Sequence, residues 1–377
     1  MGSEQSSSVR VLHVISGDLW AGAEVMAYTL LKTLQASSAV ELEAVVLNEG
    51  ILVEKLRAEG IPVTVFDESQ LGAVAIYARL KDLVRRFKPD IVHTHRQKEN
   101  VLGALAARSI GARSLRTVHG WTEFPKLGLR YDKRLFRWLD RYAGRHWQQA
   151  VVAVSQELAG KLSNEFSGTA LHVIENGVDI EAVRAQAEAQ KAALPGTPGR
   201  KRIGIVARLV PVKRHDRFLA AATLLCRDLP DTFEFYIVGD GPLAENLAAR
   251  INDMSGSATI HQLGFRDDVL GIIASLDALI VCSNHEGVPM NVLEAAALGV
   301  PVITVPLPSI ETIIRSGAFG DVADDSTAVA LSRTVQAMTG GSVTKSVELN
   351  EGWRYSASTM ARNYARLYEE LMAGSRK

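Results

Sequence analysis

The sequence predicts an α/β protein built from two doubly wound, Rossmann-like parallel sheets. Short apolar runs alternate with helix-length amphipathic segments along nearly the whole chain, and this alternation is typical of parallel strands joined by covering helices. At 377 residues the chain is long enough for about two domains. Residues 195–199, rich in Pro and Gly, interrupt the alternation, and a fresh apolar strand begins at Lys201. We therefore expect one sheet on each side of this break.

The composition is that of an ordinary globular protein. Apolar residues make up 47% and charged residues 22%, and 42 basic residues balance 42 acidic ones, which argues against a nucleic-acid partner. No apolar run approaches the roughly 18 residues of a membrane-spanning helix. The two cysteines, Cys226 and Cys282, lie in apolar surroundings, which favours a reduced, cytoplasmic protein without disulfides. The polar residues 1–8 are expected to form a disordered tail.

In the first half, the apolar runs predict a series of strands with helices between them. The expected strands are 9–15, 42–47, 63–66, 91–94, 114–118, 150–154 and 171–174. The expected helices lie near 25–34, 52–59, 73–87, 100–109 and 126–147, then after Ser155, and in an Ala-rich and Glu-rich stretch that ends near 194. The glycine turn after the first strand includes Gly22, whose missing side chain lets a ligand approach the backbone. A plain tight turn is the alternative.

Histidines follow two of these strands. His119 stands at the carboxyl end of the strand 114–118, which is the edge at which doubly wound sheets bind ligands. It is therefore a candidate site residue, with a purely structural role as the alternative. His93 and His95 stand at the end of the strand 91–94, and we expect their side chains to point to opposite faces. On that expectation they do not share a metal ion.

Residues 126–147 form the most cationic stretch of the chain. Seven basic residues stand there against Asp132 and Asp140, among apolar and aromatic side chains. The basic residues are Lys126, Arg130, Lys133, Arg134, Arg137, Arg141 and Arg145. This pattern predicts a basic amphipathic helix. Such a helix either docks on an anionic membrane surface or packs its apolar side on the domain and leaves its charges in water.

The second half repeats the alternation. Strands are expected at 201–206, 233–238, 259–263 and 278–282 and from Pro301 onward, and helices at 309–315, 328–338 and 356–372. Arg208 and Lys213 follow the first of these strands just ahead of a helix, where a phosphate would meet two cations and a helix dipole. Residues 239–244 formally match a dinucleotide-binding fingerprint, but no acidic residue follows about 20 positions later. We interpret this match as a turn between strand and helix.

The stretch 278–305 predicts a strand, a polar loop, a helix and a second strand. Glu286 and Gly287 lie in the loop, Pro289 opens the helix, and Glu294 lies one turn inside it. Ligands bind at the carboxyl end of the first strand in such a unit, so the two carboxylates frame a candidate site. The alternative is that they only favour the helix dipole.

These features together resemble glycosyltransferase family 4. The strongest part is the pair Glu286 and Glu294, whose seven intervening residues match the E-x(7)-E motif of that family. The resemblance implies the GT-B fold, in which two Rossmann-like domains face a central cleft and a C-terminal helix crosses back to the first domain. It implies an acceptor-binding domain at 9–185, a linker at 186–200, a nucleotide-sugar-binding domain at 201–355 and a returning helix at 356–377.

The resemblance also implies roles for the site residues. Glu294 would hold the ribose hydroxyls of the donor and Glu286 the hydroxyls of its sugar, while Arg208 and Lys213 would bind the diphosphate. His119 resembles a histidine near the reacting centre, and Gly22 the glycine over which the first domain closes on the phosphates. The further candidates for donor binding are Gly264, Phe265, Gly287, Val288, Pro289, Met290 and Asn291. Of these, the Gly264 and Phe265 region would be the surface against which the base stacks, and the backbone N–H groups of 288–291 would bind sugar oxygens.

The implied activity is retaining transfer of a hexose-type sugar from a UDP- or GDP-sugar. The acceptor would be a glycan, a lipid-linked sugar or a small molecule, in cell-surface polysaccharide or glycolipid biosynthesis, in the cytoplasm or on the inner face of the membrane. No cofactor and no metal are expected, since the sequence contains no Asp-x-Asp triplet of the kind that holds a metal-bound diphosphate. The alternatives are a nucleotide-sugar 2-epimerase of the same fold and an inactive sugar-nucleotide-binding protein.

Overall fold

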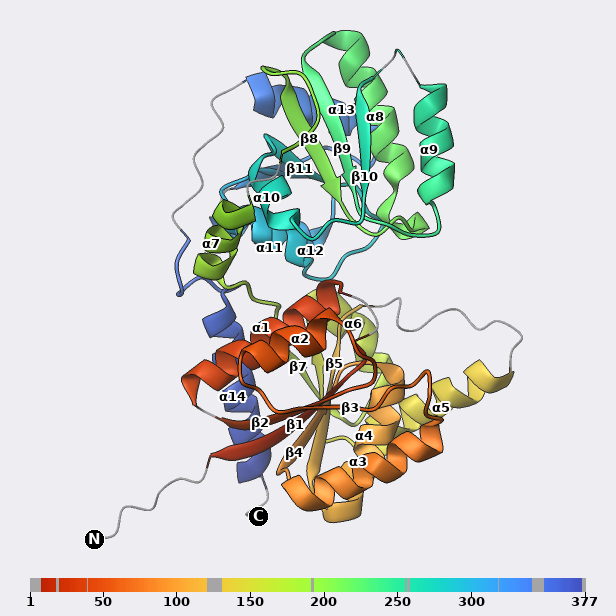
Figure 1. Ribbon diagram of the computed structural model, residues 1–377, viewed down its shortest axis with the longest axis vertical. Helices are drawn as coiled ribbons and strands as arrows, with labels where there is room; N and C mark the ends of the chain where they lie inside the picture. The colour runs from red at the N-terminus through yellow and green to blue at the C-terminus, as the bar shows by residue number, and fades with distance from the viewer. Residues whose placement is uncertain are drawn as a thin grey trace. The chain divides into compact units, whose positions relative to one another are not determined.

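The structure, a computed structural model, divides into two compact units (Figure 1). It describes residues 8–17, 20–38, 40–120, 131–190, 193–254, 256, 258–317, 319–340 and 349–374, with only the backbone for 131–135 and 339–340. Unit 1 comprises Met1–Gly177 and Arg354–Lys377, and unit 2 comprises Val178–Trp353.

Unit 1 is built on a parallel sheet in the order β3-β2-β1-β4-β5-β6-β7. The strands are β1 (Val9–Ile15), β2 (Val40–Val46), β3 (Val63–Val65), β4 (Ile91–Thr94), β5 (Arg113–Val118), β6 (Ala150–Ala153) and β7 (Ala170–Val173). The chain builds outward from β1 in one direction through β2 and β3, and then in the other through β4. The switch point of this sheet therefore lies between β1 and β4.

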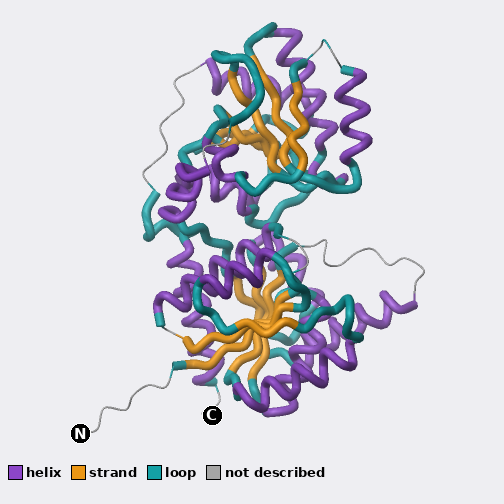
Figure 2. Tube along the Cα trace, in the orientation of Figure 1, coloured by secondary structure: helices purple, strands orange, loops and turns teal. Residues whose placement is uncertain are grey.

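Helices cover both faces of this sheet, with the strands at the centre (Figure 2). They are α1 (Gly22–Ser37), α2 (Ile51–Ala58), α3 (Ala73–Phe87), α4 (Gln97–Ile110), α5 (Tyr131–His146), α6 (Gln156–Glu165) and α14 (Ala357–Ala373). One core joins Leu12 of β1 to Leu80 of α3, and another joins Ile15 to Leu31 of α1. Because β1 is covered on both faces, its sequence is almost continuously apolar.

Unit 2 is built on a second parallel sheet, in the order β10-β9-β8-β11-β12-β13. The strands are β8 (Lys201–Val206), β9 (Phe233–Val238), β10 (Ile260–Gly264), β11 (Ala278–Val281), β12 (Val302–Thr304) and β13 (Gly320–Val322). The helices are α7 (Ile180–Gln190), α8 (His215–Asp228), α9 (Ala244–Asp253), α10 (Val269–Ala274), α11 (Met290–Ala297), α12 (Pro308–Gly317) and α13 (Ala328–Gly340), with a 3-10 turn at Pro211–Lys213. The switch point lies between β8 and β11.

The expected fold class, two Rossmann-like parallel sheets, is confirmed. The division between the two units lies earlier in the chain than the expected end of the first domain at 185. Helix α7 packs on α10 and α11, and Arg184 Nε donates to the carbonyl oxygen of Ala297 at 2.9 Å. These contacts make α7 part of unit 2, so the boundary falls between Gly177 and Val178 rather than after 185. The expected linker at 186–200 therefore begins inside a packed helix.

The C-terminal helix α14 belongs to unit 1 and packs beside α1. The residue just before this helix, Ser356, packs closely on Gly177. A Cβ atom added at Gly177 would lie only 2.3 Å from the carbonyl oxygen of Ser356. Ser356 caps the helix, its Oγ accepting from the N–H of Thr359 at 3.1 Å. Arg354 pairs with Glu175 at 2.6 Å. Among the described residues, no helix combines the length and apolarity needed to cross a membrane.

Candidate functional site

The switch point of unit 2 brings together residues from two adjacent loops. Arg208 and Lys213 follow β8, and Glu286 follows β11, which is hydrogen-bonded to β8. Open parallel sheets bind ligands at the carboxyl ends of the strands that flank a switch point. The sheet order, which the sequence does not reveal, thus places these three candidate residues where the fold favours a ligand.

Hydrogen bonds tie the two loops together around Glu286. Lys213 Nζ donates to Glu286 Oε1 at 2.6 Å, and Ser283 Oγ donates to the same oxygen at 2.5 Å. The backbone N–H of Asn284 donates to the carbonyl oxygen of Val212 at 2.8 Å. Glu286 is therefore held by a cation and a hydroxyl, which is a different environment from that of a carboxylate placed only to favour a helix dipole.

Ser283 and Arg217 support this site, and sequence analysis missed both. The buried guanidinium of Arg217, in α8, donates from Nη1 to the carbonyl oxygen of Cys282 at 2.6 Å, which holds the end of β11. A serine in a polar loop and an arginine in a helix carry no sequence signal that separates them from surface residues. Arg208 is exposed and makes no ion pair within the part of the chain that the structure describes.

The glycines at 239 and 241 shape the loop that carries Arg208. A side chain at Gly239 would place Cβ 2.1 Å from the carbonyl oxygen of Ala207, and one at Gly241 would place it 2.7 Å from that of Leu209. Both glycines have positive φ, +133° and +154°. The turn after β9 therefore packs backbone to backbone on the loop after β8. This contact explains the apparent dinucleotide fingerprint and agrees with its interpretation as a turn.

Helix α11 and the residues just before it carry the other donor-binding candidates, and the start of the helix differs from the expectation in one way. Pro289 is the N-cap residue rather than part of the first turn. The Asn291 side chain donates from Nδ2 to the carbonyl oxygen of Val206 at 2.7 Å, so it holds α11 to β8. Val288 and Met290 are buried, so only their backbone atoms can meet a ligand. Glu294 is half-buried, and desolvation raises the pKa of its carboxyl to about 7.

Gly264 and Phe265 stand at the end of β10 on the edge of the same sheet. Gly264 accepts from the N–H of Gly239 at 2.8 Å and has positive φ, +68°. The side chain of Phe265 is 59% exposed, which is unusual for a large aromatic residue. The aromatic side chain is available to a planar ligand.

In unit 1, the two candidates stand at the carboxyl edge of the sheet. Gly22 is the first residue of α1, and a side chain there would meet no atom within 4 Å among the described residues. The glycine that packing requires is Gly17, whose φ is +80° and whose added Cβ would lie 2.3 Å from Val46 Cγ1. His119 follows β5, and burial lowers its pKa to about 3, so the imidazole is neutral. Its Nε2 lies 3.2 Å from His95 Nδ1.

The expected separation of His93 and His95 is wrong. Their rings stack with centroids 4.4 Å apart. Residues two apart in a strand share a face because side chains alternate at each residue, so these two histidines face the same side of the sheet. His13 of β1 joins them, and the three side chains form a buried group whose ligand-type nitrogens lie within 4.8 Å of one another.

The basic stretch is only partly described, because 121–130 lie outside the described residues. Helix α5 buries Asp140 and exposes Trp138, which is 58% accessible and stacks on Tyr142. Arg141 pairs with Glu165 at 3.4 Å. The helix is amphipathic as expected, while its docking on a membrane stays a prediction.

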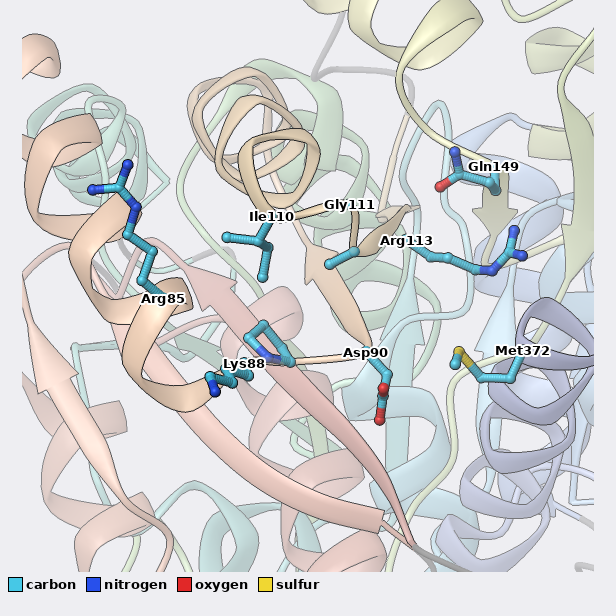
Figure 3. Close-up of a pocket in the computed structure, with 10 residues that line it drawn as sticks. Arg85, Lys88, Asp90, Ile110, Gly111, Arg113, Gln149 and Met372 are labelled. Atoms are coloured by element: carbon cyan, nitrogen blue, oxygen red, sulfur yellow. The ribbon is translucent and has the colours of Figure 1, made fainter. Parts of the chain in front are cut away.

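A cavity of about 650 Å³ lies at the opposite edge of the sheet of unit 1, near the starts of β4 and β5 (Figure 3). Its lining includes Arg85, Lys88, Asp90, Arg113, Gln149 and Met372. None of the candidate residues lines it. Because parallel sheets bind ligands at their carboxyl edge, this cavity does not mark the site that the sequence predicts.

Comparison with known proteins agrees with this geometry. Residues 20–182 match the family model "Glycosyltransferase Family 4", and residues 186–356 match "Glycosyl transferases group 1". The chain is 28% identical over 323 residues to the UDP-Gal:alpha-D-GlcNAc-diphosphoundecaprenol alpha-1,3-galactosyltransferase of Escherichia coli, covering 82% of each chain.

Solved structures share the fold. A glycosyltransferase from Rickettsia africae ESF-5 superimposes with a TM-score of 0.75 at 20% identity, covering 97% of this chain and 99% of the other. Anabaena Alr3699/HepE, in complex with UDP and glucose, gives 0.72 at 18% identity with the same coverage. Together the two family models span the described strands and helices from α1 to α13, while β1 and α14 lie outside the matched ranges. The chain belongs to the group 1 glycosyltransferases, with a first half of the glycosyltransferase family 4 type.

Proposed function

We propose that the protein transfers a hexose-type sugar from a UDP- or GDP-sugar to a glycan, lipid-linked or small-molecule acceptor with retention of anomeric configuration. The observation that carries the proposal is the contact between Lys213 and Glu286 at the switch point of unit 2. It sets a cation for phosphate and a carboxylate for sugar hydroxyls side by side, with Arg208 on the same loop. The E. coli relative acts on a UDP-sugar and a lipid-linked acceptor, which supports this class of substrates.

The chemistry of these residues suits departure of a nucleoside diphosphate. Cleavage of the bond between sugar and phosphate leaves negative charge on the diphosphate, and Lys213 and Arg208 stabilise that charge. The first N–H groups of α11 add the positive end of a helix dipole. Glu286 accepts hydrogen bonds from the sugar and Glu294 from the ribose, and Phe265 stacks on the base. We assign no nucleophile to Glu286, and attack from the leaving-group side accounts for retention.

The test is transfer itself, followed by NMR. With a donor and an acceptor, the first product formed should carry the anomeric configuration of the donor, and one nucleoside diphosphate should be released per sugar transferred. Inversion at the anomeric carbon would contradict retention. An epimerase would instead change the configuration at C2 of the donor sugar in the absence of an acceptor. An inactive binding protein would give neither a glycosylated acceptor nor an epimerised sugar.

We also propose that transfer needs no divalent metal. Two side-chain cations and a helix N-terminus supply the positive charge that a metal supplies elsewhere. Initial rates should therefore be the same in EDTA and in magnesium. Loss of activity in EDTA with recovery on adding magnesium would contradict this proposal.

Donor binding should weaken as the pH falls below 7. Burial raises the pKa of Glu294 to about 7, so the free protein gains a proton there in mildly acidic solution. Only the ionised carboxylate of Glu294 can accept hydrogen bonds from both ribose hydroxyls. Below the pKa, donor binding therefore requires that the Glu294 carboxyl first lose its proton. The donor affinity should fall about tenfold per pH unit below the pKa. Calorimetric titrations should show this slope in the wild type and not in Glu294→Gln; a pH-independent wild type would contradict it.

For the acceptor side, we propose that α5 docks on an anionic membrane surface. The exposed Trp138 and Tyr142 stand on a helix that also carries Arg137 and Arg141. The protein should float with liposomes that contain anionic lipid, and charge neutralisation by Arg137→Gln with Arg141→Gln should reduce flotation. The same change at Arg85 and Arg86 of α3 is the matched control. Equal flotation of both variants would exclude α5 as the docking element.

A further inference from the structure

A continuous chain of buried side chains runs through unit 1 from the C-terminal helix to His119. We call it the histidine–tyrosine chain. Its members come from β1, β4, β5 and α14 and the residues that directly follow β4 and β5. In order from the helix they are Tyr364, Thr117, His93, Tyr368, His13, His95 and His119.

The part of the chain nearest His119 consists of three imidazoles. His119 Nε2 lies 3.2 Å from His95 Nδ1, and His95 Nε2 lies 3.1 Å from His13 Nδ1. His13 Nε2 in turn lies 3.4 Å from the hydroxyl of Tyr368. Each ring nitrogen of His95 and His13 therefore has a hydrogen-bond partner.

The other part joins the two tyrosines of α14. The hydroxyl of Tyr368 lies 2.8 Å from His93 Nδ1, and His93 Nε2 lies 2.8 Å from Thr117 Oγ1. The hydroxyl of Tyr364 lies 2.8 Å from the same Thr117 oxygen. The chain thus links residues that are up to 355 positions apart in the sequence.

Burial keeps the chain uncharged. His13, His93 and His95 are at most 1% exposed, and desolvation lowers the pKa of each, to about 3 for His13. The charge of Arg96 lowers the pKa values of His95 and His119 further. Desolvation raises the pKa of Tyr368, so its hydroxyl keeps the proton that it donates.

A neutral chain of this kind has a direction. A neutral imidazole carries one N–H and one acceptor nitrogen, so each histidine that makes two bonds donates one and accepts the other. Hydroxyl donors make short bonds, near 2.7–2.8 Å, and N–H donors tolerate longer ones. Of the two possible directions, we take the one that gives the hydroxyl of Tyr368 the shorter contact as donor: Tyr368 donates to His93 Nδ1 at 2.8 Å and accepts from His13 Nε2 at 3.4 Å. In this direction His93 Nε2 donates to Thr117 Oγ1 at 2.8 Å.

This direction fixes the tautomer of His119. If His13 donates from Nε2, then its Nδ1 accepts from His95 Nε2. His95 Nδ1 then accepts from His119 Nε2, which leaves the Nδ1 of His119 without a proton. The two nitrogens of His119 differ in function as a result, since only the unprotonated one can accept a hydrogen bond.

We propose that His95, His13 and Tyr368 are positioning residues that fix the ring orientation and the Nε2–H tautomer of His119. This inference rests on the proposed function and on the expectation, from the family resemblance, that His119 stands near the reacting centre. The C-terminal helix thereby contributes to the electrostatics of the carboxyl edge of unit 1. A metal ion held by His13, His93 and His95 is the competing interpretation, and it would have to displace hydrogen bonds that already use both nitrogens of each ring.

The test uses the full-length protein labelled with ¹⁵N at histidine. Long-range ¹H–¹⁵N spectra, assigned with His119→Gln, should show His119 as the neutral Nε2–H tautomer in the wild type. Tyr368→Phe removes the hydroxyl that His13 donates to and should convert His119 to a mixture of tautomers. It should also lower kcat between about 10- and 100-fold with little change in the KM of the donor. Tyr364→Phe, at the far end beyond Thr117, is the matched control and should leave the His119 signals unchanged.

The outcomes separate this inference from the proposed function. A tautomer change in Tyr368→Phe without sugar transfer by the wild type would support the chain and reject the function. Sugar transfer with unchanged His119 signals and an unchanged kcat in Tyr368→Phe would overturn the inference, as would stoichiometric zinc bound at the three histidines. If Tyr368→Phe does not fold, as judged by circular dichroism, His13→Asn is measured in its place with the same expected results.

Discussion

Replacing Lys213 with alanine should reduce sugar transfer by about 100-fold or more, because the leaving diphosphate loses one of its two cations. The fold should survive. Lys213 is 23% exposed and its partner Glu286 is 10% exposed, and Ser283 still donates to Glu286 when the lysine is gone. Steady-state release of nucleoside diphosphate measures the loss, and circular dichroism measures the fold.

Lys201→Ala is the matched control for this change. Lys201 lies in the same unit and also forms an ion pair, with Asp277 at 2.9 Å, but at the other end of β8. Its loss should leave the transfer rate at the wild-type value. Full turnover by Lys213→Ala would remove this residue from the site and, with it, the assigned position of the diphosphate.

The second large effect concerns stability. Asp140→Ala should lower the free energy of unfolding by about 3–5 kcal/mol, because it leaves the guanidinium of Arg116 buried without its carboxylate. Arg116 is fully buried, and its Nη1 donates to Asp140 Oδ1 at 2.7 Å. Asn100 Nδ2 donates to the same oxygen at 3.2 Å and would also lose its acceptor. Denaturation by urea measures the change.

An exposed pair in the same unit provides the comparison. Asp82 lies 3.7 Å from Arg85 on α3, and both side chains are more than half exposed. Asp82→Ala should cost about 0–1 kcal/mol, since solvent screens such pairs. If Asp140→Ala were as mild as Asp82→Ala, the buried pair would not hold α5 to β5.

Much of the fold could be predicted from the sequence because both sheets are parallel and covered on both faces. Their strands then appear as continuous apolar runs, and β1 and β9 were placed with their observed bounds. β13 and α10 were missed because each is too short for its apolar residues to show the periodicity of a strand or a helix. The units divide before α7 and not at the Pro-rich and Gly-rich break at 195–199, because the packing of α7 on α10 and α11 places this helix in unit 2.

The candidate site was only partly predictable for a related reason. The local sequence around Lys213 and around Glu286 predicted each residue as a separate candidate. Their contact joins residues 73 positions apart and forms only because β8 lies next to β11. The strand-end histidines 93, 95 and 119 stood out in the sequence, but their connection to α14 did not, since Tyr368 meets His13 and His93 only when α14 packs on unit 1. The sequence also does not show that the side-chain amide of Asn291 donates to the end of β8, whereas the role expected for this residue concerns its backbone N–H.

The central claim is that a nucleotide-sugar binds at the switch point of unit 2, between the loops after β8 and β11. Thermal unfolding against a panel of UDP- and GDP-sugars tests it most directly, because a ligand that binds the folded state raises Tm by mass action. We predict that one class of donor raises the Tm of the wild type and of Lys201→Ala, and that the double variant Lys213→Ala with Glu294→Gln shows no rise. An equal rise in the double variant, or no rise with any nucleotide-sugar, would contradict the claim.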